Sequence, residues 1–387
     1  MARPRDAATA IIDRGYRRLA IGRGARRRHL RLRSVVVAAG LGVAIVAAAV
    51  VALGLGSYPL SPAAVVDVFV GGGLPLDRTV VFEWRLPRTL AAILLGAYLA
   101  VAGALFQTVT GNPLASPDIL GLSNGAFTGM LLTVVFVSTS WPALTAGAVA
   151  GGLVTAAAIA VLGGRVRQQG FGLIVIGIGV AAMLASANTW MLLQVELETA
   201  MFASAWGAGT LNGVTGAAVA GAALCGIPLL IALGALAPRL RQLDLGDDVA
   251  VTTGARPMRA RRGALLIGVL LVSIATAVIG PIAFIALAAP QIARRLARTP
   301  FLSLTLSAFV GAALLLASDM IAQHALPVAL PRGRRHRVRR RPLPRLHPRP
   351  GDPPPCLTPP PSPRAPRRAC PPRRSRSATT VRRSSAR

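Results

Sequence analysis

The sequence contains no lysine, because all 43 of its basic residues are arginine. A P-loop uses a lysine to reach the terminal phosphates of a bound nucleotide. The chain therefore has no ordinary Walker A site. A process driven by ATP would need another protein to bind the nucleotide.

Charged and aromatic residues are also scarce. Charged residues make up 14% of the chain, against roughly 25% in typical soluble domains. Aromatic residues make up 4%, whereas 53% of the residues are hydrophobic. This composition argues against a soluble enzyme and favours a polytopic, all-α protein whose helices pack in lipid.

Only three cysteines are present, Cys225, Cys356 and Cys370, and their spacing predicts neither a disulfide nor a metal site. Cys225 lies in an apolar run. We expect it to be a small buried hydrophobic residue.

The positive charge is concentrated at the two ends of the chain. The net charge is +9 for residues 1–33, +4 for residues 34–330 and +17 for residues 331–387. We therefore expect a basic N-terminal segment, a membrane domain over 34–330 and an Arg/Pro-rich disordered tail over 331–387.

Apolar runs of about 20 residues, the length needed to cross a bilayer, recur through the central region. The first begins at Ser34 and is too long for the apolar part of a signal peptide. With one shorter run, 282–297, nine helices are expected. The other runs are 34–56, 89–110, 118–138, 141–162, 172–193, 214–236, 263–280 and 302–323.

The distribution of arginine predicts how these helices are oriented. Arginines gather in the loops 163–171 and 238–262 and at the end of 282–297, all on the same side as the N-terminus. Since cytoplasmic loops carry an excess of arginine, we expect the N-terminus to be cytoplasmic. Arg85 and Arg88 fall on the opposite side, where this bias alone would not place them.

Several short motifs follow one another within residues 34–330. They are Arg85-Leu86-Pro87-Arg88, Asn112-Pro113-Leu114-Ala115, Pro117-Asp118-Ile119-Leu120-Gly121, Leu245-Gly246-Asp247-Asp248-Val249, Gly280-Pro281-Ile282-Ala283-Phe284 and Pro290-Gln291-Ile292-Ala293-Arg294. In order and spacing these motifs resemble the FecCD-type permeases of ABC importers, which take up iron-siderophores, haem and cobalamin. The family commonly has His after the proline of the last motif, where this chain has Gln291.

The resemblance implies that 34–330 is a transmembrane permease domain in the cytoplasmic membrane, with the family's tenth helix missing or replaced. It also implies that Arg85 and Arg88 contact carboxylates of a substrate-binding protein. Fixed guanidinium groups suit such pairing. From the residues alone, anchoring to lipid headgroups at a helix end remains an alternative.

Two further segments acquire roles from the resemblance. Asn112, Pro113 and Leu114 would help to close the cytoplasmic end of the pathway, although asparagine and proline are also ordinary turn formers. Leu245, Gly246, Asp247, Asp248 and Gly254 would form short helices that dock on an ATPase subunit. The alternative for them is a solvated loop that follows the positive-inside rule.

Polar residues inside the helices give weaker predictions. Asp319 lies near the outer end of the last helix. This position favours a packing or interfacial role over a role in an ion pathway, because buried acids are costly in lipid. Gln323 stands where family members can have a basic residue that also meets the binding protein. Asn188, Thr189 and Trp190 face either the pathway or another helix.

The resemblance implies no catalytic residue, no metal site and no cofactor on this chain, since ATP and Mg²⁺ would sit on the partner. The expected partners are an ABC ATPase, a substrate-binding lipoprotein or periplasmic protein, a second permease subunit (identical or a paralogue) and membrane lipid. No nucleic-acid partner is expected.

The tail departs from the family, whose final helix opens with a Leu-Pro-Val-Gly-like motif. Codons chosen for residues 331–347 and read in a shifted frame give Pro-Val-Gly and then an apolar run. We hypothesise a frameshift near Leu330, in the gene or in its sequencing, which would make 331–387 a frameshift product and could leave the chain non-functional.

Three rival interpretations remain open. An ion-gradient-driven secondary transporter would need intramembrane carboxylates, which the central helices almost lack. A membrane protein whose basic tail binds nucleic acid or anionic lipid would have its function in 331–387. Within the same family, cobalamin or haem could replace the siderophore.

Overall fold

The computed structural model describes residues 18–21, 28–164, 171–243, 246–254, 256–299 and 301–324. The chain divides into two units, residues 1–328 and 329–387, and every described residue lies in the first. The tail 331–387 and the predicted loop arginines Arg165 and Arg167 therefore lie outside the described residues.

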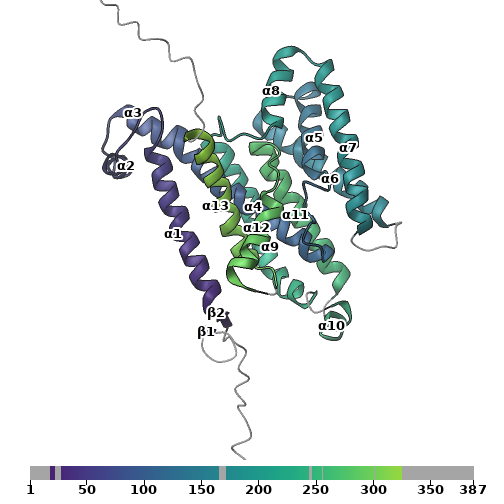
Figure 1. Cartoon of the computed structure of the whole chain (residues 1–387). Coiled ribbons are helices and arrows are strands. Elements are labelled where there is room, and N and C mark those ends of the chain that lie inside the picture. The colour runs from purple at the N-terminus through teal and green to yellow at the C-terminus, as the bar shows by residue number, and fades with distance from the viewer. Residues whose placement is uncertain are drawn as a thin grey trace, which may run out of the picture. The chain divides into compact units, whose positions relative to one another are not determined.

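The described residues form a helical bundle preceded by one short antiparallel hairpin (Figure 1). The expected all-α membrane architecture is confirmed, with the hairpin as a small addition. In chain order the elements are β1 (Arg18–Ile21), β2 (Arg28–Arg31), α1 (Leu32–Gly54), α2 (Pro62–Phe69), α3 (Pro75–Arg78), the π-helical η2 (Thr79–Arg85), α4 (Leu86–Thr110), α5 (Leu122–Phe136), α6 (Trp141–Gly164), α7 (Phe171–Gln194), α8 (Leu197–Gly207), α9 (Gly216–Leu243), α10 (Asp247–Thr252), α11 (Pro257–Ile279), α12 (Ile285–Ala297) and α13 (Leu304–His324).

Each of the nine expected helices is present. Among the described residues, seven helices are long and apolar enough to cross a membrane, counting α3, η2 and α4 as one continuous span. The helix predicted over 118–138 is shorter in the structure, where α5 begins only at Leu122. The residues before it belong to a turn in which Gly121 has φ +78°. The short helices α2, α3 and α8 were not predicted, since none carries a long apolar run.

Helix α4 is the centre of the bundle and packs against α13, α11, α12 and α9. Leu95, Tyr98 and Leu99 on this helix are almost completely buried. An apolar helix with no polar face is typical of such a buried position. The helix that carries Arg88 at its start is therefore held on several sides.

Small residues allow the helices around α4 to approach closely. A Cβ on Gly96 would lie 2.6 Å from the backbone oxygen of Gly311, so α4 and α13 touch backbone to backbone. Gly103 packs in the same way on the carbonyl of Ala286 in α12. Pro290, four residues after Ala286, has no N–H to offer that carbonyl. Close contacts between small residues are what holds helices together in lipid.

Helices α5, α6, α7 and α8 form a second group beside this centre (Figure 1). Glycines of α5 face glycines of α6, with Gly129 against Gly147 and Gly125 against Gly151. Since a side chain at any of these positions would collide with the facing backbone, the pair depends on glycine.

Other helix faces are apolar and uncovered. Val43 and Val46 of α1 are exposed, as expected for a surface that meets lipid. Cys225 on α9 is also exposed, which corrects the expectation that it would be buried. Periodicity could not reveal this, because every face of a helix in lipid is apolar.

Candidate functional site

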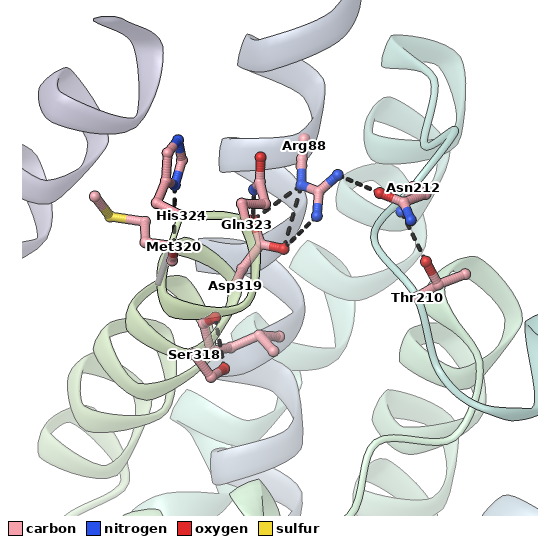
Figure 2. Close-up of polar contacts among 9 residues, drawn as sticks. Arg88, Thr210, Asn212, Ser318, Asp319, Met320, Gln323 and His324 are labelled. Carbon is pink, nitrogen blue, oxygen red and sulfur yellow. Dashed lines mark hydrogen bonds and ion pairs between the residues drawn. The ribbon is translucent and has the colours of Figure 1, made fainter. Parts of the chain in front are cut away.

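An ion pair and a hydrogen bond of Arg88 join three parts of the chain at one end of the bundle, here called the Arg88 end (Figure 2). Arg88, in the first turn of α4, places Nη2 2.6 Å from Oδ1 and Nε 2.9 Å from Oδ2 of Asp319 in α13. The same guanidinium donates to the side-chain oxygen of Asn212, which lies between α8 and α9. Gln323 donates to Asp319 Oδ2 at 2.6 Å. The bidentate pairing is the strong geometry for arginine and carboxylate.

The burial of this pair is unequal. The side chain of Asp319 is 8% exposed, whereas that of Arg88 is 22% exposed. Asp319 therefore needs its partners, because a buried carboxylate without them is costly. Part of the Arg88 side chain remains accessible from outside the bundle.

Arg85 has a different role from Arg88 in the structure. It lies at the end of η2 and donates to the backbone oxygens of Leu53 at 2.7 Å and Tyr58 at 2.6 Å. It thus satisfies one carbonyl in the last turn of α1, where carbonyls lack partners within the helix, and one in the loop that follows. The two arginines predicted to act together lie at the same end, and each is already hydrogen-bonded within the chain.

A compact turn over residues 111–121 lies at the opposite end, here called the α10 end. Asn112 accepts a hydrogen bond from the backbone N–H of Leu114 at 2.9 Å, the usual way in which asparagine stabilises a turn. Pro113 lies inside this turn, and the side chain of Leu114 is 64% exposed. The three predicted gate residues therefore lie in one hydrogen-bonded turn, with the apolar side chain of Leu114 exposed.

Asp118 is a partly buried acid in the same turn, outside the membrane-spanning helices. Ser123 donates to its Oδ1 at 2.8 Å and Ser116 to its Oδ2 at 3.4 Å. Burial raises the pKa of this carboxyl to about 6, against the opposing effect of the two serine hydrogen bonds. Asp118 ties the turn to the first residues of α5.

The predicted coupling segment contains a real helix, α10, which packs against α9 and α11. Gly246 at φ +99° and Gly254 at φ +80° bound it, in conformations that favour glycine. Asp248 is exposed on this helix. Leu245 and the side chain of Asp247 lie outside the described residues.

Valine residues make α10 unusual for a surface helix. Val249 is 43% exposed and Val251 is 60% exposed, while Ala250 between them is buried. A short helix at a solvent-facing loop normally exposes polar residues. This apolar surface at the α10 end is therefore a candidate contact for another protein.

Polar contacts also cross the interior of the bundle. Gln291 of α12 donates to Gln107 of α4 at 2.6 Å, and Gln107 donates to the backbone oxygen of Leu287. Asn188 of α7 is buried and bonds Thr128 and the backbone of Asn124 on α5, so it faces another helix. Thr189 bonds within its own helix and Trp190 is exposed.

Sequence reasoning missed the partners in these contacts. Gln291 was recognised only as a departure from histidine, and Asn212 carried no signal because it lies in a loop between helices.

Among the described residues, no group of three or more His, Cys, Asp or Glu side chains could hold a metal ion.

Among the described residues, seven helices long and apolar enough to cross a membrane, with Arg88 paired at one end and an apolar loop helix at the other, make this a polytopic membrane protein. The FecCD transport family model matches residues 43–334, and the chain belongs to this family.

Known relatives agree with this assignment. The chain is 44% identical over 291 residues to the ferric enterobactin transport system permease protein FepG of Escherichia coli, covering 75% of this chain and 88% of that protein. It is 32% identical to the probable siderophore transport system permease protein YfhA of Bacillus subtilis, covering 73% and 85%. Among solved structures it matches a metal-chelate type ABC transporter in an inward-facing conformation, with 25% identity and a TM-score of 0.65, covering 76% and 92%.

Proposed function

We propose that this chain is the permease subunit of an ABC importer that carries a ferric siderophore or similar metal chelate across the cytoplasmic membrane. The observation that carries the proposal is 44% identity to a ferric enterobactin permease over 88% of that protein's length. The energy comes from ATP hydrolysed on a partner, since the chain has no lysine for a P-loop.

The Arg88 end is the outer side and the N-terminus is cytoplasmic in this proposal. The arginines at the end of α9 and the start of α11 lie at the other end, as the positive-inside rule requires. A binding protein that delivers the chelate would contact the Arg88 end through its own carboxylates. Arg88 offers the partly exposed guanidinium for this, while Arg85 holds the end of α1 beneath it.

The α10 end is the inner side. The exposed valines of α10 provide an apolar contact for the ATPase, and the packing of α10 on α9 and α11 connects that contact to the bundle. The turn of Asn112, Pro113 and Leu114 lies at the same end, where its exposed leucine can exclude water from a pathway shared with a second permease subunit.

Cobalamin is the second candidate substrate within the family. The chain is 34% identical to the vitamin B12 import system permease protein BtuC of Vibrio cholerae, covering 65% of this chain. The higher identity and wider coverage of the enterobactin permease favour the siderophore.

A substrate screen tests this choice. The complex of this chain with its ATPase and binding protein, reconstituted in vesicles, should accumulate a ferric catecholate siderophore in preference to cyanocobalamin. Preferential uptake of cyanocobalamin would replace the siderophore by the second candidate.

A further inference from the structure

A narrow apolar groove with a single charged residue lies between α6 and α11, towards the α10 end of the bundle. Its volume is about 450 Å³, and all of its lining residues except Arg262 are apolar. Its walls include Phe106, Leu122, Leu153, Ile159, Leu266 and Arg262.

The residue spacing on the two helices gives the groove two facing walls. On α11, residues 262, 265, 266 and 269 recur at helical spacing and lie on one face. On the antiparallel α6, residues 153, 156, 157 and 160 do the same. Seven residues of helix rise about 10 Å, so each wall is about that long.

Side-chain size keeps the groove open at one end and closed at the other. On α6, alanines 156, 157 and 160 are too small to fill the space opposite the leucines of α11. Deeper in the bundle, Gly152 packs directly against Ser273, where the two helices meet. The groove therefore begins at Arg262 and ends where α6 and α11 touch.

Both walls belong to helices that are long and apolar enough to span the membrane. Where the groove faces the bilayer, acyl chains surround it, and water inside it would find no polar partner except Arg262. Arg262 is exposed, and among the described residues no hydrogen bond or ion pair engages its guanidinium. A cation above an apolar slot is complementary to an anionic headgroup above an acyl chain.

We propose that this groove binds one anionic glycerophospholipid of the surrounding bilayer, with an acyl chain between α6 and α11 and its phosphate on Arg262. The lipid would fix the separation of these helices beside the turn that carries Leu120. This binding does not depend on the transport function, so either proposal can fail without the other.

Native mass spectrometry of the full chain in detergent tests the proposal, with dioleoyl phosphatidylglycerol and dioleoyl phosphatidylcholine as probes. The wild type should retain phosphatidylglycerol preferentially. Arg262→Ala should lower its apparent affinity about fivefold, the effect expected from one arginine at a membrane surface, and Arg262→Lys should restore most of it.

The matched control is Arg259→Ala, which removes the same charge from an exposed position of α11 that does not line the groove. Equal losses in the Arg259 and Arg262 variants would show general attraction of the arginine-rich chain for anionic lipid and would overturn the proposal.

Two further measurements keep the test decisive if Arg262→Ala does not fold. Ala157→Phe fills the groove while leaving Arg262 in place, and it should lower phosphatidylglycerol retention. Inorganic phosphate at millimolar concentration should not displace the lipid. Unchanged retention in Ala157→Phe, or displacement by free phosphate, would contradict a site that recognises both chain and headgroup.

Discussion

At the scale of single residues, the ion pair between Arg88 and Asp319 dominates the Arg88 end. Asp319 was expected to have a packing or interfacial role, and the structure gives that role a partner on α4. The pairing could not be predicted because the two residues are 231 positions apart and the intervening chain has no pattern that would bring them together.

A double-mutant cycle measures this contact. Arg88→Gln, Asp319→Asn and the double variant should give a coupling energy of about 1–3 kcal/mol in unfolding, because each single change leaves a partly buried polar partner. Thermal or denaturant unfolding in detergent provides the values.

Arg78 is the control for this cycle. It lies at the same end and donates to the backbone oxygen of Gly72, away from Asp319. A cycle between Arg78→Gln and Asp319→Asn should give no coupling. Coupling as large as that of Arg88 would mean that general charge, and not the observed contact, stabilises this end.

Asp118 gives a prediction for pH. Its folded-state pKa of about 6 lies above the ordinary value of 3.8, so between these values the folded protein holds a proton that the unfolded chain has released. Stability should therefore fall as pH rises from about 4 to about 6. Asp118→Asn lacks this contribution. The thermal midpoint of the variant, minus that of the wild type, should therefore increase by roughly 5 °C as pH rises over that range.

Asp248→Asn is the matched control, since Asp248 is an exposed carboxylate at the same end of the bundle. Its midpoint relative to wild type should stay nearly constant over the range. A pH dependence in Asp118→Asn identical to that of wild type would show that this carboxyl is not the group responsible.

At the scale of helices, the sequence predicted much and missed what periodicity cannot reveal. The long apolar runs predicted every spanning helix, because crossing a bilayer demands about 20 apolar residues whatever the neighbours are. The beginning of α5 was misplaced, since Gly121 and the partly buried Asp118 belong to a turn inside an apolar stretch. Which helix faces lipid, and which faces another helix, depends on packing alone.

The contact between α4 and α13 is sensitive to a single methyl group. Gly96→Ala should lower the stability by about 1–3 kcal/mol, because its Cβ would meet the backbone of Gly311 and the helices would have to separate. Gly40→Ala in α1 is the control, because nothing lies near its added Cβ and alanine favours a helix. Equal thermal midpoints for the two variants would argue against this close contact.

The apolar surface of α10 gives a prediction about coupling. Val251→Asp should weaken binding of the ATPase and reduce the ATP hydrolysis that the assembled complex supports, since a buried charge in an interface is costly. Val70→Asp makes the same change at a valine just after α2, near the Arg88 end, which is 82% exposed against 60% for Val251, and it should leave hydrolysis unaffected. Unchanged hydrolysis in Val251→Asp would exclude α10 as the contact.

At the scale of the whole molecule, the predicted family is confirmed, and the roles of Arg85, Arg88, the turn at Asn112 and the α10 segment stay predictions. The frameshift near Leu330 also stays a prediction, because residues 325–387 lie outside the described part. Resequencing the coding region tests it, and a peptide from 331–387 found by mass spectrometry, together with an uninterrupted frame, would contradict it.

The most direct test of the central claim is uptake of a ferric siderophore labelled with radioactive iron. The chain, produced from a resequenced gene, would be reconstituted in vesicles with its ATPase and binding protein. Accumulation should require ATP and stop when the ATPase carries an inactivating change in its own P-loop. Uptake driven by an ion gradient without the ATPase would contradict the account.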